Sequence, residues 1–282
     1  MRQFIVEKQN VKNGLIELIG KDFRYLRQVL RVKKGDMLNV RFDDGVLQGT
    51  TVAFIDDRAK KITLQICETS GGADNTITRG VQASEIENSS SAASGSSFVN
   101  YVLFQFIPKP QKFELILRQA TECGVSIVVP VIGEFSEKNC TNMFEGAKRE
   151  RFERIIREAR QQSGSPVATK LLEPATLEGA LDWLKSNNKS DESALNVVLW
   201  ERTEGEVPLF ELVKSRNQKD KIKNVCIAVG NEGGISPLEI KLLKEKGFFS
   251  TIHFETNILR CETASLYGIA AVQTAVTQLQ GE

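Results

Sequence analysis

Glycine, carboxylate and arginine side chains near the end of this chain are spaced so that they could hold a ligand and act on it chemically. Two segments there share one layout: a short apolar strand, a turn, and a helix start. The first turn contains Gly230, Gly233 and Gly234, which allow close backbone approach or a positive φ. The second ends at Arg260 and Glu262, a cation and a carboxylate at a helix start. Turns at the carboxyl ends of parallel strands form a ligand crevice, so we predict a binding site between them.

The glycine turn lacks the common nucleotide-binding spacings. Neither G-x-G-x-x-G nor a P-loop ending in glycine, lysine and serine or threonine is present, which disfavours dinucleotide and P-loop sites. Ser236 and Glu239 follow the turn with Pro237 between them, the spacing of a capping box with proline at the first helical position. A helix is therefore predicted to begin at Pro237.

Three regions must position these residues. Residues 1–72 are β-rich with one helix over 21–32, which predicts a small β-barrel. Residues 73–97 are rich in serine and poor in apolar residues, which predicts a flexible linker or insert. Residues 98–282 alternate strands and helices, which predicts an α/β domain with a parallel sheet covered on both faces. The expected strands run over 3–7, 14–18, 37–42, 46–55 and 61–68, then 101–107, 126–132, 196–200, 224–229 and 251–254.

Composition limits the possible functions. With 282 residues the chain can bury a real core, and its net charge of +1 means that any RNA binding must come from local patches. Five separated cysteines without a C-x-x-C pair indicate reduced thiols and a cytoplasmic protein. The one histidine, His253, falls in an expected strand, where packing is its simplest role. We expect no metal site and no membrane span.

Basic helical faces are the candidate RNA contacts. In the helix expected over 21–32, Arg24, Arg27 and Arg31 form one stripe, opposed within the helix only by Asp22. Such a stripe suits a phosphate backbone, although an ordinary solvated face is the alternative. The helix expected over 144–162 mixes arginine with glutamate, which favours surface ion pairs for most of its charges. The RNA-binding candidates are Arg2, Arg24, Arg27, Arg31, Lys112, Arg160 and Gln162.

Several motifs give the chain a family resemblance. The runs G-N-E-G-G-I-S at 230–236 and I-L-R-C-E-T-A at 258–264 resemble the two signatures of the bacterial 16S ribosomal RNA uridine-N3 methyltransferases of the RsmE type. These belong to the SPOUT class. Shorter fragments fall in family order along nearly the whole chain: 1–4, 29–31, 120–125, 136–138 and 158–163. The chain departs from the family pattern at Ser165, Asn231, Glu255 and Asn257.

The resemblance implies a fold and a reaction. The fold is an N-terminal PUA-like β-barrel followed by a SPOUT α/β domain with a C-terminal trefoil knot, and a homodimer is expected. The reaction is transfer of a methyl group from S-adenosylmethionine to N3 of a uridine in 16S ribosomal RNA of the small subunit. We expect Arg260 to stabilise charge on the uracil or to position the RNA, and Glu262 or Glu232 to accept or relay the proton. Helix capping is an equally good explanation for Glu262.

The implied cofactor requires an apolar slot for adenine, backbone groups at its edge and negative potential near the sulfonium. Strand packing is the alternative role for the apolar candidates, including Trp200. The cofactor-binding candidates are Leu199, Trp200, Glu201, Val229, Gly230, Asn231, Glu232, Gly233, Gly234, Phe254, Ile258, Leu259, Arg260, Thr263 and Ala264.

Two other functions remain open. The departures from the family pattern leave room for a non-catalytic RNA-binding protein of the same fold. A SPOUT methyltransferase acting on transfer RNA also fits the sequence.

Overall fold

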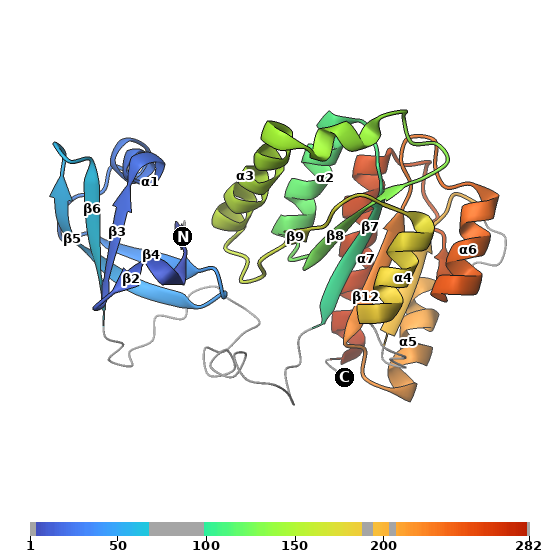
Figure 1. Cartoon of the computed structure of the whole chain (residues 1–282). Helices are drawn as coiled ribbons and strands as arrows, with labels where there is room; N and C mark the ends of the chain where they lie inside the picture. The colour runs from blue at the N-terminus through green and yellow to red at the C-terminus, as the bar shows by residue number, and fades with distance from the viewer. Residues whose placement is uncertain (1–3, 68–98, 188–193, 203–206, 281–282) are drawn as a thin grey trace. The chain divides into compact units, whose positions relative to one another are not determined.

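The computed structural model describes residues 4–67, 99–187, 194–202 and 207–280. The chain divides into two compact units (Figure 1). One comprises Met1–Ser96 with Gln161–Ala168, and the other Ser97–Arg160 with Thr169–Glu282. Arg2 and the linker expected over 73–97 lie outside the described residues.

The N-terminal unit is built on a curled six-stranded sheet in the order β1-β4-β5-β6-β3-β2. β1 is parallel to β4, and the other pairs are antiparallel. The strands are β1 (Phe4–Val6), β2 (Val11–Lys12), β3 (Leu15–Ile19), β4 (Met37–Phe42), β5 (Leu47–Asp56) and β6 (Lys61–Ile66). β3 alternates exposed and buried residues, so Ile16 and Leu18 enter the core.

The helix of this unit is shorter than the sequence predicts. α1 (Gly20–Arg24) continues as one π-helical segment, η2 (Tyr25–Val29), and not as an α-helix to residue 32. Arg31 follows the helix with a φ of 55°. The chain turns back after the π-helical segment, where Val32 N donates a hydrogen bond to Leu26 O. The side chains of both residues are buried. Burial of this pair ends the helix early and removes Arg31 from the predicted stripe.

The C-terminal unit contains the predicted parallel sheet, in the order β10-β8-β7-β12-β11-β13 with β9 paired to β8. Every strand pair in it is parallel. The strands are β7 (Asn100–Phe106), β8 (Ile127–Ile132), β9 (Lys170–Leu171), β10 (Ala175–Thr176), β11 (Ala194–Leu199), β12 (Asn224–Val229) and β13 (Ser250–Ile252). The central strands β7 and β12 are buried along almost their whole length, as expected for a sheet covered on both faces.

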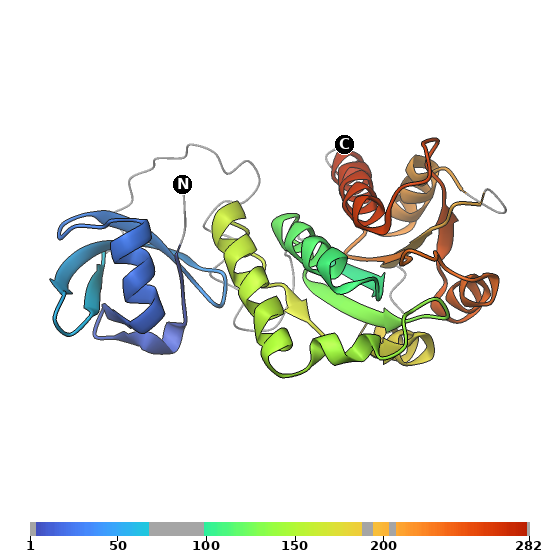
Figure 2. The same ribbon diagram turned by 90° about the horizontal axis from the view of Figure 1, so that it is seen from above.

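Helices cover both faces of this sheet (Figures 1 and 2). One face carries α2 (Pro110–Glu122), α3 (Gly146–Ser163), α5 (Leu209–Lys219) and α7 (Cys261–Gln280). The other carries α4 (Leu177–Asn187) and α6 (Pro237–Gly247). Phe113, Phe144 and Phe152 pack edge to face or tilted at centroid distances of 5.1–5.5 Å, which joins α2 to α3.

Two features of the last third of the chain position the candidate site. The predicted capping box of α6 is confirmed. The backbone N–H of Glu239 donates to the Ser236 side chain, and the backbone N–H of Ser236 donates to the Glu239 side chain. The strand expected over 251–254 ends instead at Ile252, so the prediction that His253 lies in a strand is wrong. The chain leaves the sheet edge there and runs as a loop to α7.

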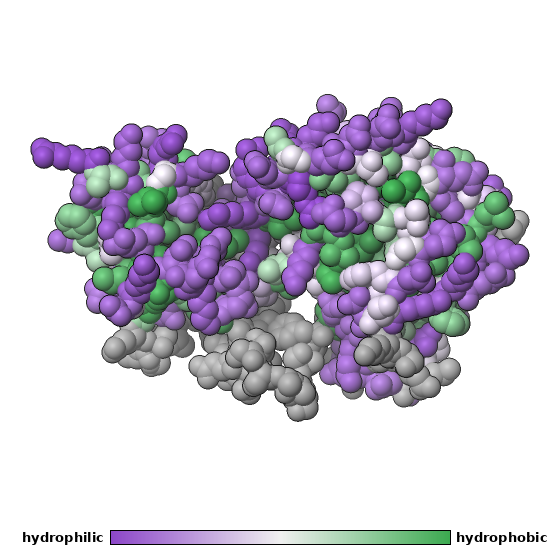
Figure 3. Space-filling model, viewed as in Figure 1, coloured by the Kyte–Doolittle hydropathy of each residue, from purple (hydrophilic) through white to green (hydrophobic). Residues whose placement is uncertain are grey.

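Hydrophilic side chains dominate the surface viewed in Figure 3, with smaller apolar areas between them. Some large apolar side chains are nevertheless exposed in the last third of the chain, among them Leu238, Ile258 and Tyr267. Within the described ranges, no helix combines the length and the apolar content that a membrane crossing needs.

Candidate functional site

A pocket of about 320 Å³ lies where β11, β12 and β13 end. The two turns predicted to form a crevice contribute to the same pocket, together with the segment after β11. Of the predicted cofactor-binding residues, those lining it are Leu199, Trp200, Glu201, Val229, Gly230, Asn231, Glu232, Gly233, Gly234, Phe254, Ile258, Leu259 and Ala264.

Two of the predicted residues, Arg260 and Thr263, do not line this pocket. Arg260 is exposed between Leu259 and Cys261, which both line it. The lining residues that sequence reasoning missed are Ile235, Ile252, His253, Thr256, Asn257 and Cys261. Most of them are sequence neighbours of predicted ones, and a window over the whole second turn would have found them.

The glycine turn is closed by contacts that only small residues allow. A Cβ on Gly230 would lie 2.8 Å from the backbone carbon of Gly234, so any side chain there collides with main chain. Gly234 has a φ of 79°, which favours glycine. Asn231 bonds across the turn, since its Oδ1 accepts from Gly233 N at 2.9 Å and its Nδ2 donates to Ile107 O at 3.4 Å. The asparagine thereby restrains a position at which the chain departs from the family pattern.

Gln105 on β7, which is not among the residues predicted from the sequence, is hydrogen-bonded to this turn. It is fully buried at the end of β7, and its Nε2 lies 3.3 Å from Val229 O and 3.2 Å from Gly230 O. Its Oε1 accepts a 2.6 Å bond from Ser265 Oγ on α7. One amide therefore connects β7, the glycine turn and α7. The available signal was a lone polar residue in an apolar strand, which must find partners when buried.

Trp200 supplies an unpaired donor in the pocket wall. Its side chain is buried, and among the described residues its indole Nε1 has no hydrogen-bond partner. The Trp200 carbonyl lies 3.3 Å from His253 Nδ1, and the Arg202 guanidinium carbon lies 5.6 Å from the indole centroid. A buried N–H without a partner is costly, and a ligand acceptor would satisfy it.

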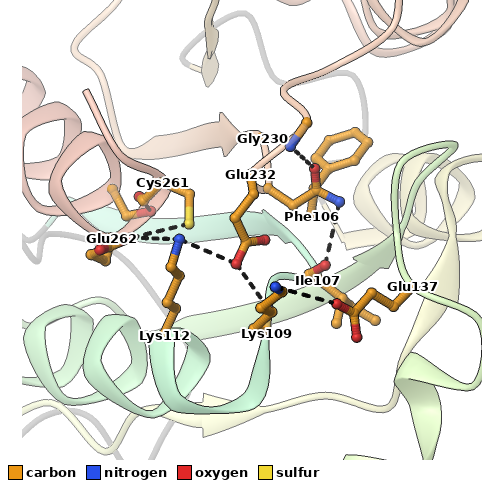
Figure 4. Close-up of polar contacts among 12 residues, drawn as sticks. Phe106, Ile107, Lys109, Lys112, Glu137, Gly230, Glu232, Cys261 and Glu262 are labelled. Atoms are coloured by element: carbon orange, nitrogen blue, oxygen red, sulfur yellow. Dashed lines mark hydrogen bonds and ion pairs between the residues drawn. The ribbon is translucent and has the colours of Figure 1, made fainter. Parts of the chain in front are cut away.

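An ion cluster lies beside the pocket (Figure 4). The Lys112 Nζ on α2 lies 3.2 Å from Glu232 Oε1 on the glycine turn and 3.6 Å from Glu262 Oε2 on α7. The thiol of Cys261 donates to Glu262 Oε2 at 3.3 Å, and Lys109 N donates to Glu232 Oε1 at 3.3 Å. Three separate elements thus bring two predicted catalytic carboxylates to one ammonium group.

The protonation states of this cluster follow from its contacts. Burial opposes ionisation of Glu262, but bonds from its own backbone N–H, from Cys261 and from Lys112 hold its pKa below the usual value. Partial burial lowers the pKa of Lys112, but the bond to Glu232 and nearby negative charge raise it overall. Burial and the bond to Glu262 raise the pKa of Cys261 to about 12. At neutral pH the site therefore holds an ionised Glu262, an ammonium and a neutral thiol.

The RNA-binding candidates are placed differently from one another. Arg27 makes a two-bond pair with Asp57, with both N···O distances at 2.9 Å, whereas Arg24 and Arg31 are exposed. Arg160 is buried at the end of α3, and Gln162 is exposed. The predicted surface pairing of α3 is seen in the ion pairs Arg149–Glu153 and Arg154–Glu158.

Across the part of the chain that the structure describes, no three histidine, cysteine, aspartate or glutamate residues are arranged to hold a metal ion. Each of the five cysteines is a free thiol.

Comparison with known proteins identifies relatives over most of the chain. Residues 96–273 match the family model of the RNA methyltransferase domain. Ribosomal RNA small subunit methyltransferase E of Aquifex aeolicus is 34% identical over 54% of this chain, a match that spans 58% of that relative's length. Ribosomal RNA small subunit methyltransferase E 2 of Borreliella burgdorferi is 26% identical over 100% of both chains.

A solved structure shares the fold over both units. Ribosomal RNA small subunit methyltransferase E from Neisseria gonorrhoeae, bound to S-adenosyl methionine, aligns over 97% of each chain with a TM-score of 0.69 and 21% identity.

Proposed function

This chain belongs to the RNA methyltransferase domain family, as the resemblance in its sequence predicted, and we propose from this premise that it is an S-adenosylmethionine-dependent methyltransferase of 16S ribosomal RNA. Its proposed target is N3 of a uridine in small-subunit RNA. The observation that carries the proposal is the pocket at the strand ends, with the cluster of Lys112, Glu232 and Glu262 beside it.

The residues present fit S-adenosylmethionine. The glycine turn brings main chain to the pocket, and a Cβ on Gly230 would collide with the Gly234 backbone and distort the turn. Trp200 offers an unpaired indole N–H in a wall that also contains Ile252 and Leu259. The carboxylates of Glu201 and Glu232 line the same pocket and supply the negative charge that a sulfonium favours. This donor set contains no lysine or arginine, so it suits a cationic ligand better than a phosphate.

S-adenosylmethionine supplies an electrophilic methyl carbon, whose bond to sulfur breaks as the bond to uridine N3 forms. The remaining work belongs to the protein. Uridine N3 is a poor nucleophile until its proton leaves, so a carboxylate of the cluster must accept that proton. Arg260 stands free at the pocket edge and stabilises the negative charge that develops on the uracil oxygens.

We also propose the knotted path and the PUA-like barrel of the SPOUT relatives for this chain. Trp200 N donates to Ile252 O, and Val207 N donates to Thr251 O, both at 3.2 Å. The described residues Trp200 and Val207, which both follow β11, are thus each bonded to β13, and the chain continues from β13 into the pocket loop. This arrangement supports a threaded segment. The curled N-terminal sheet with its single helix supports a PUA-like RNA-binding unit.

The proposal places the protein in the cytoplasm, with the small ribosomal subunit or its RNA as partner. The test is incubation with methyl-labelled S-adenosylmethionine and either small-subunit RNA, assembled subunits or transfer RNA. Mass spectrometry of the digested nucleosides is expected to find 3-methyluridine in the first two only, and Gly230→Ala to abolish it. Labelled transfer RNA alone would assign another substrate. Cofactor and RNA binding without labelling would indicate a non-catalytic RNA-binding protein.

A further inference from the structure

The two carboxylates of the cluster beside the pocket have different surroundings. Glu262 is 15% exposed and does not line the pocket. Its carboxylate receives bonds from its own backbone N–H and from Cys261, and it pairs with Lys112. These donors fix the carboxylate and reduce its basicity. Glu262 is therefore poorly suited to accept a proton.

Glu232 keeps one carboxylate oxygen available. Its Oε1 is held by Lys112 Nζ at 3.2 Å and by Lys109 N at 3.3 Å. Its Oε2 has no hydrogen-bond donor among the described residues, its side chain is 31% exposed, and it lines the pocket. Held by one oxygen and open at the other, this side chain has the arrangement that a general base needs.

We propose that Glu232 accepts the N3 proton of the uridine, that Lys112 is the residue that positions Glu232, and that Glu262 is the fixed anion that holds Lys112 in place. This inference rests on the proposed methyl transfer and assigns roles within it. It also moves Lys112, a candidate RNA contact in the sequence, into the catalytic cluster.

The proton and charge balance is simple. The N3–H bond breaks, the proton passes to Glu232 Oε2, and the electron pair left on N3 forms the bond to the transferred methyl group. Before the step the cluster carries two carboxylates and one ammonium, and afterwards one of each. Lys112 cannot itself be the base, because the raised pKa keeps its amine protonated. Its part is to hold one Glu232 oxygen so that the other faces the substrate.

Four variants and a control test this assignment. Single-turnover methylation of small-subunit RNA, with cofactor and RNA saturating, is measured for Lys112→Met, Lys112→Arg, Glu232→Gln and the double variant Lys112→Met with Glu232→Gln. Lys112→Met is expected to lower the rate roughly 10- to 100-fold through misplacement of the base. Lys112→Arg keeps the charge and is expected to lose less. Lys241, paired with Glu245 on α6, gives the control Lys241→Met with an unchanged rate.

The double variant separates positioning from other roles. If Lys112 acts through Glu232, the double variant is no more than about threefold slower than Glu232→Gln alone, because residues that act together are not additive. Calorimetric affinity for S-adenosylmethionine remains within about threefold of wild type in Lys112→Met and Lys112→Arg. Glu232→Gln removes a carboxylate from the pocket wall and weakens cofactor binding, so the rates are compared at saturating cofactor. A second readout needs no turnover: Glu232→Gln and Glu262→Gln each lower the pKa of Lys112, followed by NMR of its side-chain nitrogen.

Three results would overturn the assignment. Full additivity in the double variant would mean that Lys112 and Glu232 act separately. A normal rate in Lys112→Met with weakened RNA binding would make Lys112 a phosphate contact. An unchanged Lys112 pKa in both glutamine variants would mean that neither carboxylate interacts with Lys112, so that the three residues form no cluster. Absence of 3-methyluridine with the wild-type protein would instead reject the proposed function, and this assignment with it.

Discussion

Arg260 is the residue whose role depends most on what it meets during the reaction. It is exposed, and among the described residues its side chain makes no hydrogen bond or ion pair. A guanidinium held at the pocket edge by the start of α7 can offer two donors to a carbonyl oxygen or a phosphate. Since this side chain makes no such contact, we expect substitution of Arg260 to change the rate of methyl transfer without changing the stability of the fold.

We expect Arg260→Ala to lower the single-turnover rate by roughly 100-fold, the usual effect of losing one preorganised donor, with little change in cofactor affinity. Arg260→Lys is expected to restore only part of the rate because it lacks the planar fork. The exposed Arg118 on α2 provides the control Arg118→Ala. A near-normal rate for Arg260→Ala would leave the charge on uracil to be stabilised by other groups.

Glu262 links the cluster to folding stability. Its pKa is depressed in the folded protein, so its contribution is fully present above the unfolded value of about 4.3 and is lost as pH falls through the folded value. We expect Glu262→Gln to reduce the free energy of unfolding at neutral pH, and the difference from wild type to shrink below about pH 4. Denaturant titrations across this range measure it.

The matched control for this measurement is Glu178→Gln. Glu178 lies in the first turn of α4, the same position that Glu262 has in α7, but it is exposed, and among the described residues it has no lysine or thiol partner. A pH-independent difference for Glu262→Gln would mean that the loss comes from packing and not from ionisation.

At the scale of elements, the glycine turn makes its own prediction. At Gly230 an added Cβ meets the main chain of Gly234, whereas at Gly233 it meets the side chain of Phe135, 2.6 Å from the Phe135 Cβ. We expect Gly230→Ala to weaken S-adenosylmethionine binding more than tenfold and to cost roughly 1–3 kcal/mol of stability through overpacking. Gly233→Val should also weaken binding, because rotation of the Phe135 side chain does not move its Cβ and the backbone that carries Phe135 must shift instead.

Calorimetry and thermal unfolding measure both effects. Gly179→Ala on α4, where the nearest atom to an added Cβ is Thr176 Oγ1 at 3.4 Å, is the control that should keep both properties. Equal cofactor affinity for wild type and Gly230→Ala would remove this turn from the binding site.

The N-terminal helix makes a second prediction at this scale. Because Arg27 is occupied by Asp57, only Arg24 and Arg31 of the predicted stripe are exposed to contact phosphates. Arg24→Gln and Arg31→Gln are each expected to reduce the slope of RNA affinity against salt by about 0.7–0.9 per lost contact, and Arg27→Gln to reduce it less. Filter binding over a range of KCl concentrations measures the slopes. Three equal slopes would contradict the distinction.

At the scale of the whole molecule, we expect two copies of the chain to associate. The apolar residues Ile269, Val272 and Val276 of α7 are buried within their own unit, so they do not supply a contact surface. Ile258 is 88% exposed and Tyr267 is 46% exposed. The ring centroids of Tyr267 and Phe254 lie 4.9 Å apart. Burial of Ile258 and Tyr267 against a second copy of the chain would remove their apolar surface from water.

Sedimentation at micromolar concentration is expected to show a dimer, and Ile258→Asp combined with Tyr267→Asp to shift it to monomer. Phe54→Asp, at an exposed phenylalanine of the N-terminal unit, should leave the dimer intact. A wild-type protein that sediments as a monomer would refute the association.

Local patterns in the sequence were enough to predict several parts of this protein. Alternating strands and helices predicted the parallel sheet, and three residues in the right spacing predicted the capping box of α6. The spacing of Gly230, Gly233 and Gly234 predicted a turn at a strand end. Each of these features depends on residues within a few positions of one another, so short-range sterics and hydrogen bonding determine them.

The tertiary structure alone decided which distant groups meet. Lys112 and Glu232 are 120 positions apart, and Gln105 and Ser265 are 160 positions apart, yet each pair is in contact. The sequence pattern identified the basic stripe that contains Arg27. The ion-pair partner of Arg27, Asp57, comes from the turn between β5 and β6. Periodicity indicates which face of an element is polar or apolar. It carries no information about the distant element packed opposite that face, because chain topology and core packing bring the two together.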